Sequence, residues 1–206
     1  MPTSEDSPEE RTGPREVTDP QTMRALTHPV RQALIELLVA EGPLTATQAG
    51  ERIGEPPNTC SFHFRQLARY GFVEEAGRGP GRTRPWKLTN AGMRFSDLHE
   101  DAETTLAARA LDRMLRERYF ARLQAFYDTR SSYPRRWQEV TGGSEFVLHV
   151  APDELHALDE QITGLLLQYR DRITDPALRP ADSLPVEVLM FAYPIRPPDG
   201  PAGPER

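Results

Sequence analysis

The chain has 206 residues, which is enough for two modest domains or one large one with a core that folds independently. Its single cysteine excludes an internal disulfide and any metal cluster held by several cysteines. No apolar run approaches the ~20 residues that span a bilayer, and no charged start precedes an apolar core as in a signal peptide. We therefore expect a cytoplasmic protein without a membrane partner.

The net charge of −6 is unevenly distributed along the chain. Residues 1–19 contain six acidic and two basic side chains, and residues 95–206 contain nineteen acidic and thirteen basic ones. Residues 20–94 have the opposite balance, with ten bases and six acids. A local basic surface attracts phosphate even on an acidic protein, because the local field governs the encounter. The charge pattern therefore leaves room for a nucleic-acid partner.

The first 18 residues are rich in Pro, Glu, Ser and Thr and have almost no apolar content, which predicts a disordered tail over residues 1–18. An acidic arm that competes with DNA is the functional alternative. Helical spacing begins at Asp19, which can cap a helix that has Pro20 at its first position. Pro29 should break or kink this helix. A second helix is predicted over residues 30–40, ended by a Gly-Pro pair.

Two further short helices follow, separated by a tight turn. Thr45 can cap a helix over residues 46–53, and residues 54–56 form the turn. The next helix spans about residues 57–70 and is stopped by Gly71. This order of parts is typical of a helix-turn-helix, whose second helix enters a DNA major groove.

A predicted hairpin completes the unit. Residues 72–75 and 84–88 read as short strands, and the wing between and at the start of the second, residues 77–84, contains three arginines and several glycines. The loop lacks the Gly-Lys-Ser/Thr ending of a nucleotide phosphate cradle, whereas arginine suits a DNA backbone and a narrow minor groove. We therefore assign residues 19–92 to a winged helix-turn-helix DNA-binding domain, with a plain hairpin loop as the alternative. The predicted wing contacts are Arg78, Arg82 and Arg84.

The helix over residues 57–70 has an apolar side and a polar side. The side chains expected to pack inward are Cys60, Phe64, Leu67 and Ala68. On the polar side, amides can pair with adenine edges, arginines with guanine or phosphate, and an aromatic ring with thymine methyls. The predicted DNA contacts of this helix are Asn58, Thr59, Ser61, Phe62, Arg65, Gln66 and Arg69. Solvated residues of an ordinary surface helix are the simpler alternative.

Residues 93–129 read as one long linking helix with apolar positions every three or four residues. Such a stripe commonly pairs two copies of a chain. The residues predicted to form a homodimer contact are Leu111, Leu115, Tyr119 and Leu123. Packing of the same stripe within one chain is the alternative.

The pattern changes to strand, helix and strand in residues 130–195. Residues 146–150 alternate, a helix begins at Asp153, and Pro185 precedes a second strand over residues 186–193. We predict a β-α-β-like C-terminal module that dimerises or senses a ligand, followed by a tail over residues 196–206. The fold class is thus mainly α with a small β content, α+β. The aromatic residues around this module could line a pocket for a small-molecule effector, form a second dimerisation layer, or simply fill a core.

Residues 26–31, Leu-Thr-His-Pro-Val-Arg, are followed by Leu34 and Leu37-Leu38, and residues 61–67, Ser-Phe-His-Phe-Arg-Gln-Leu, are closed by a Gly-Phe-Val sequence. These motifs resemble the opening helices and the recognition helix of ArsR-type winged-helix regulators, over about residues 20–92. The resemblance implies a homodimeric transcriptional regulator, usually a repressor, on an imperfect palindrome. Phe62 stands where a histidine is common and Pro57 replaces a polar residue, so base preference should differ.

The chain also departs from the metal-sensing members of that family. Residues 46–52 lack their Cys-x-Cys motif, and Cys60 on the inward side reads as a buried thiol rather than a redox sensor. His99 lies near several acidic residues, which could bind a metal but read more simply as a solvated helix face. We predict no metal and no cofactor.

A different class of function is also considered. No Gly-x-Ser-x-Gly elbow, His-Glu-x-x-His or phosphate loop indicates an enzyme. The stronger alternative to a DNA-binding regulator is a winged-helix module for protein interaction without DNA binding, because this fold does not dictate its partner.

Overall fold

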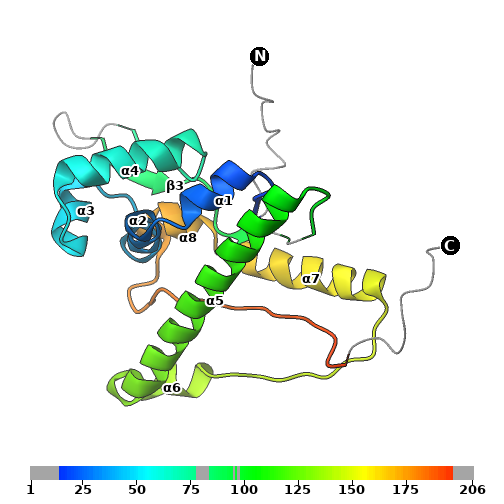
Figure 1. Cartoon of the computed structure of the whole chain (residues 1–206). Coiled ribbons are helices and arrows are strands. Elements are labelled where there is room, and N and C mark those ends of the chain that lie inside the picture. Colours follow the sequence, from blue (N-terminus) through cyan, green and yellow to red (C-terminus); the bar gives the residue numbers. More distant parts are fainter. Residues whose placement is uncertain (1–13, 78–83, 95, 97, 197–206) are drawn as a thin grey trace.

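The structure is a computed structural model that describes residues 14–77, 84–94, 96 and 98–196. Helices dominate it, with two small two-stranded sheets, so the predicted α+β class is confirmed. Figure 1 shows α1 to α4 grouped around the hairpin, with the long helix α5 running away from this group towards α6. The helices and strands are β1 (Arg15–Glu16), α1 (Pro20–Leu26), α2 (Pro29–Glu41), α3 (Ala46–Ile53), α4 (Pro57–Arg69), β2 (Val73–Glu75), β3 (Trp86–Leu88), β4 (Met93–Arg94), α5 (Ala102–Thr129), η1 (Arg130–Ser132), α6 (Arg135–Val140), α7 (Pro152–Leu167), α8 (Asp171–Thr174) and η2 (Pro176–Leu178).

Local capping explains where the first helices begin. The backbone N–H of Thr22 donates to the Asp19 carboxylate over 2.8 Å, as predicted for an N-cap. Pro29 takes the first position of α2, where a helix needs no N–H, and the N–H of Val30 donates to Nδ1 of His28 over 3.2 Å. The proline thus starts α2 one residue before the predicted start.

The α3 helix has the predicted bounds because a capping box starts it and a glycine ends it. The N–H of Gln48 donates to the Thr45 hydroxyl over 3.2 Å, and the N–H of Thr45 donates to the Gln48 side chain over 2.9 Å. This reciprocal capping box satisfies two otherwise free donors. Gly54 ends the helix in the left-handed region, with φ of 73°.

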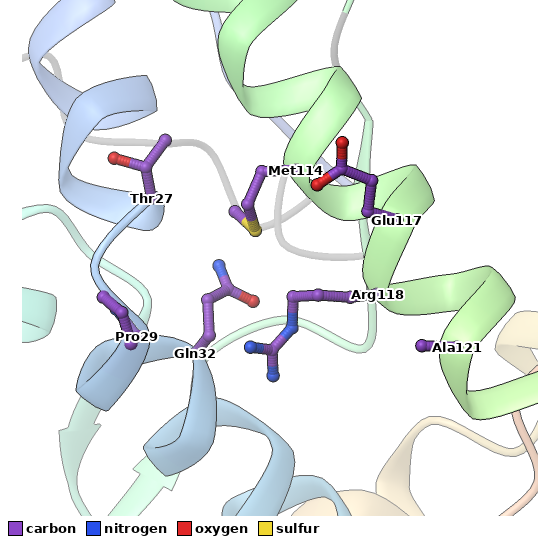
Figure 2. Close-up of a pocket in the computed structure, with 7 residues that line it drawn as sticks. All are labelled: Thr27, Pro29, Gln32, Met114, Glu117, Arg118 and Ala121. Carbon is purple, nitrogen blue, oxygen red and sulfur yellow. The ribbon is translucent and has the colours of Figure 1, made fainter. Parts of the chain in front are cut away.

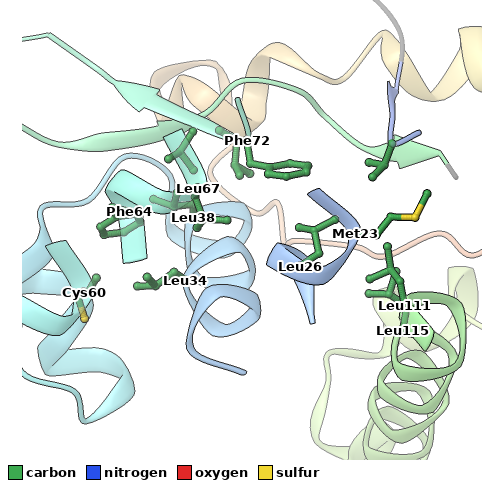
Figure 3. Close-up of a cluster of buried hydrophobic side chains, with 14 of the residues drawn as sticks. Met23, Leu26, Leu34, Leu38, Cys60, Phe64, Leu67, Phe72, Leu111 and Leu115 are labelled. Atoms are coloured by element: carbon green, nitrogen blue, oxygen red, sulfur yellow. The ribbon is translucent and has the colours of Figure 1, made fainter. Parts of the chain in front are cut away.

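One apolar core joins the short helices to the first half of α5 (Figure 3). Its buried side chains come from all of α1 to α5, so α5 packs in the same core as the helix-turn-helix. The largest of them are Met23, Leu26, Leu34, Leu38, Phe64, Leu67 and Leu111.

This packing corrects two of the predicted dimer contacts. Leu111 and Leu115 are 0% and 2% exposed in a single chain, within the core cluster that also holds Met23 and Leu26 of α1 (Figure 3). Their side chains are therefore unavailable to a partner, because they pack within one chain. Tyr119 is half-buried and Leu123 is 42% exposed, so only the later part of the stripe stays open.

The predicted N-terminal tail is wrong for its last residues. Residues 1–13 lie outside the described part, but Arg15 and Glu16 form β1, which pairs in parallel with Met93 and Arg94 of β4. Val17 is only 2% exposed in the core. A tertiary strand pair thus orders a segment whose composition alone predicts disorder.

The same pairing corrects the start of the long helix. Met93 and Arg94 are in β4, and α5 begins only at Ala102, where the N–H of Thr104 donates to the Asp101 carboxylate over 2.7 Å. These hydrogen bonds from Thr104 lower the pKa of the Asp101 carboxyl. The first two residues of the predicted helix therefore form β4 instead, and they pair with β1.

The predicted β-α-β-like module is wrong in its strands. The α7 helix forms close to its predicted start, but in the described residues after 98 there is no strand. Residues 144–151 and 184–194 are extended without regular structure (Figure 1). The second of these stretches crosses α5 (Figure 1), where the ring of Phe191 stacks on Phe120 with 5.9 Å between centroids. A strand requires a neighbour for its backbone groups, and the described residues do not supply one here.

Candidate nucleic-acid interface

The inward side of α4 is locked into the core as predicted. Cys60, Phe64 and Leu67 are each 0% exposed, and Ala68 packs against the cluster. The Phe64 ring stacks on Trp86 of the hairpin, with 5.6 Å between ring centroids. Burial, followed by the nearby Glu55 carboxylate, raises the pKa of the Cys60 thiol, so the thiolate is disfavoured. The inward side thus fixes the rotation of α4 about its axis.

The outward side of α4 presents all seven side chains that the sequence predicts as DNA contacts. Asn58, Phe62, Arg65 and Arg69 are exposed, and Thr59, Ser61 and Gln66 are half-buried. The exposed ring of Phe62 is 51% accessible, whereas Phe64 two residues later is buried. Because the buried side chains set the helix rotation, the seven share one surface of the protein.

The turn between α3 and α4 depends on Gly50. Its carbonyl accepts the N–H groups of Gly54 and Glu55 over 2.9 and 3.1 Å. A Cβ on Gly50 would meet the carbonyl oxygen of Glu55 closer than 3.0 Å, which real Cβ atoms essentially never do. The absent side chain therefore lets the two helices approach at the angle that the turn sets.

The hairpin forms as predicted, but its loop is only partly described. Strands β2 and β3 pair antiparallel with Glu75 opposite Trp86, and Trp86 also exchanges two backbone hydrogen bonds with Leu44. Arg78 and Arg82 lie outside the described residues. Arg84 is exposed, and its guanidinium donates to the Glu75 carboxylate over 2.9 Å. Exposed pairs of this kind contribute little, so a DNA phosphate could compete for Arg84.

A histidine pair behind the recognition helix is a feature to which sequence analysis assigned no role. The rings of His28 and His63 have centroids 4.4 Å apart, and His63 is 7% exposed. Burial, then the proximity of His28 and Arg31, lowers the pKa of His63. Its Nδ1 and the Nε of Arg31 are buried without a hydrogen-bond partner among the described residues. The two motifs quoted for the family resemblance contain these residues, but only the fold brings them together.

The lowered pKa of His63 predicts a pH-dependent stability. Below its ordinary pKa of about 6.5, the unfolded chain binds a proton at this position more readily than the folded chain. The free energy of unfolding should therefore decrease as the pH falls from 6.5 towards the lower folded-state pKa. We expect His63→Gln, which stays neutral, to lose less stability than the wild type between about pH 7.5 and 5.5. Urea unfolding at both pH values measures this difference, and an equal loss in both proteins would contradict it.

An open pocket lies where the end of α1 and the start of α2 meet α5, outside the C-terminal module. It measures about 280 Å³. Figure 2 shows Arg118 reaching from α5 towards Gln32 of α2, where the Gln32 amide donates to the Leu26 carbonyl over 2.6 Å. The lining residues are Thr27, Pro29, Gln32, Met114, Glu117, Arg118 and Ala121.

The C-terminal aromatic residues form neither a core nor a closed pocket. Phe120, Tyr169, Phe191 and Tyr193 are between 50% and 73% exposed. Of the acidic residues near His99, Asp101 caps α5 and Glu103 pairs with Arg24 over 2.6 Å, while Asp97 lies outside the described residues. These carboxylates therefore have structural roles at the start of α5.

The order α3, turn, α4 and hairpin is that of a winged helix-turn-helix. Residues 26–76 match a family model described as a helix-turn-helix domain. This segment is thus a helix-turn-helix domain of the type found in ArsR-like regulators, and the chain has no Cys-x-Cys motif there. The match confirms the domain type that the sequence motifs predict.

The other comparisons add little to this assignment. A structure of a MarR family protein from Mycobacterium tuberculosis, in complex with salicylic acid, aligns at 13% sequence identity. The alignment covers 72% of this chain and 87% of that chain with a TM-score of 0.28, too low to carry an argument. No curated protein matches the chain. In the described part of the chain, no helix is both long and apolar enough to cross a membrane.

Proposed function

We propose that the protein is a sequence-specific transcriptional repressor that works in the cytoplasm as a homodimer on an imperfect palindrome. The observation that carries the proposal is the outward side of α4. Its polar and charged residues face away from a core that Phe64 and Leu67 hold rigid. Rigid support matters because base readout depends on side chains held at fixed positions in the major groove.

In this proposal α4 reads the base sequence and the wing binds the DNA backbone. The first turns of α4 present amide and hydroxyl groups, with Asn58 exposed at the entry of the helix. These groups can choose among base edges, and the exposed Phe62 ring can contact thymine methyls. The wing arginines would instead hold the sugar–phosphate backbone, which sets orientation and overall affinity. Two copies related by a two-fold axis would read the two halves of the palindrome.

A protein-interaction module remains the alternative, because Phe62 is a large exposed ring at the centre of this surface. The two functions differ in their dependence on salt. Binding to DNA releases counterions and weakens steeply as salt rises, for specific and non-specific sites alike. Fragments of the protein's own genomic DNA, selected by binding, would supply the site for such measurements, and recovery of no preferred sequence would favour the alternative.

We expect the double variant Arg82→Ala/Arg84→Ala to bind all DNA more weakly, with a flatter salt dependence. Each lost phosphate contact should reduce the slope of log K against log salt by about 0.9, so the pair should reduce it by up to about 2. The variant Arg135→Ala/Arg136→Ala is the matched control, because it removes the same charge from α6, outside the helix-turn-helix. Fluorescence anisotropy at several salt concentrations measures both slopes. A slope that is the same in both variants would contradict the wing assignment.

A further inference from the structure

The C-terminal part of the chain has no core of its own. Among the described residues after Leu115, none is buried. Ordering such a long segment costs conformational entropy that only burial of apolar surface can offset. Instead, fifteen of its large apolar side chains between residues 146 and 195 are from 39% to 82% exposed. They are Phe146, Val147, Leu148, Val150, Leu165, Leu166, Tyr169, Leu178, Leu184, Val186, Val188, Met190, Phe191, Tyr193 and Ile195.

Two extended segments within this surface also lack backbone partners in strands. Residues 146–150 and 186–193 have strand-like sequence and are extended, yet belong to no sheet in the described chain. The first contains no Asp, Glu, Lys or Arg, and the second contains only Glu187, which pairs with Arg122 of α5. An uncharged, unpaired strand edge is a template for pairing with another strand.

The remaining parts of this chain are unable to cover the surface. The residues outside the described part contain Met1 and Phe95 as their only large apolar side chains and are otherwise polar, Gly, Ala or Pro. Residues 144–195 contain nine acidic and three basic side chains, which disfavours both DNA and anionic lipid. This composition and charge favour protein from another molecule as the cover.

We propose that a second copy of this chain covers the surface, with residues 146–150 and 186–193 of each copy pairing across a two-fold axis into an intermolecular sheet backed by α7. The same segment on both copies gives a self-complementary interface that closes after two subunits. Fifteen such side chains expose on the order of 1,000 Å² per chain, above the ~800 Å² per partner of a standard interface. The partner's strands would supply the neighbours that one chain lacks.

The inference deepens the proposed function, whose homodimer it locates, and moves the interface away from Leu111 and Leu115. It is continuous with the open part of α5, because Phe191 stacks on Phe120 and Glu187 accepts from Nε of Arg122 over 3.2 Å. These contacts connect the proposed sheet to α5, which packs on the helix-turn-helix. The spacing of the two recognition helices would then follow from this interface.

Analytical ultracentrifugation of the full chain at micromolar concentration tests the proposal. The wild type should be a dimer, and Leu148→Glu/Val188→Glu should dissociate it roughly 100-fold or more easily, because two unpaired charges would be buried. Val39→Glu/Leu106→Glu is the matched control, since it places the same charges on exposed apolar positions of α2 and α5. A monomeric wild type, or a dimer that withstands the first variant but not the control, would overturn the proposal.

Two further measurements separate misfolding and loss of DNA binding from loss of the dimer. Backbone amides of residues 146–150 and 186–193 should exchange slowly with deuterium in the wild type and rapidly in the Leu148→Glu/Val188→Glu variant; fast exchange in a wild-type dimer would overturn the sheet. The variant should still bind a DNA half-site, since Leu148 and Val188 are not among the residues of the core that supports α4. A wild-type dimer that binds no DNA would refute the proposed function alone, and a DNA-binding monomer would refute this inference alone.

Discussion

Replacing Phe64 by alanine is expected to lower the free energy of unfolding by about 3–5 kcal/mol. The Phe64 ring is fully buried and stacks on Trp86, whose backbone pairs with both β2 and Leu44. Its removal would leave a cavity where the recognition helix, the wing and the start of α3 meet. Because these elements converge on one ring, the change should also reduce DNA binding through loss of folded protein. Urea denaturation followed by circular dichroism measures the stability.

The matched control is Phe62→Ala, two residues earlier on the same helix. Phe62 is 51% exposed on the outward side, so its removal should change stability by about 0.5 kcal/mol or less. If the proposed function is correct, the same change should weaken DNA binding while stability stays nearly unchanged. A purely structural residue would instead affect stability first. Equal loss of stability in the two variants would show that the assigned rotation of α4 is wrong.

The second large effect is expected for Gly50→Ala, at about 3 kcal/mol of lost stability. Alanine usually stabilises a helix relative to glycine by roughly 0.5–1 kcal/mol, so the predicted sign is opposite to the helix-propensity rule. The reason is steric, since the new Cβ would meet the backbone carbonyl of Glu55, which cannot rotate away as a side chain could. The turn would have to open, and α4 would leave its position relative to α3.

Gly164→Ala on α7 separates this clash from the general preference for alanine. A Cβ at Gly164 meets nothing within 4 Å, so the change should leave stability unchanged or raise it slightly. Thermal unfolding of both variants gives the comparison. If Gly50→Ala were as stable as Gly164→Ala, the close approach of α3 and α4 described here would be incorrect.

The elements of the helix-turn-helix could be predicted because their signals are local. The Thr45 cap, the Gly54 turn and the Gly71 stop lie within a few residues of the helices they bound, and α3 has the predicted limits. The seven outward residues of α4 followed from the same periodicity, since four buried or packed residues set the rotation of the helix. Here backbone geometry and side-chain chemistry act over one or two turns.

The larger errors concern contacts between distant segments. Residues 15–17 are ordered only because β4, more than seventy residues later in the chain, accepts them as a strand partner. The stripe with Leu111 was assigned to a dimer because periodicity reveals an apolar face but not what covers it, and α1 covers it. His28 and His63 are unremarkable in sequence and meet only after α2 packs on α4.

Sequence alone was thus sufficient for the helices of the helix-turn-helix, their caps and the surface that α4 presents, because those depend on interactions within a few residues. Tertiary structure decided which face of α5 is buried, where the N-terminal strand lies and that the predicted C-terminal strands stay unpaired in one chain. Strand pairing and burial depend on which partner is present, and a period in the sequence does not specify that partner. The exposed apolar segments after residue 144 follow the same physics, since their pattern is that of strands and the neighbour we propose for them is a second copy of the chain.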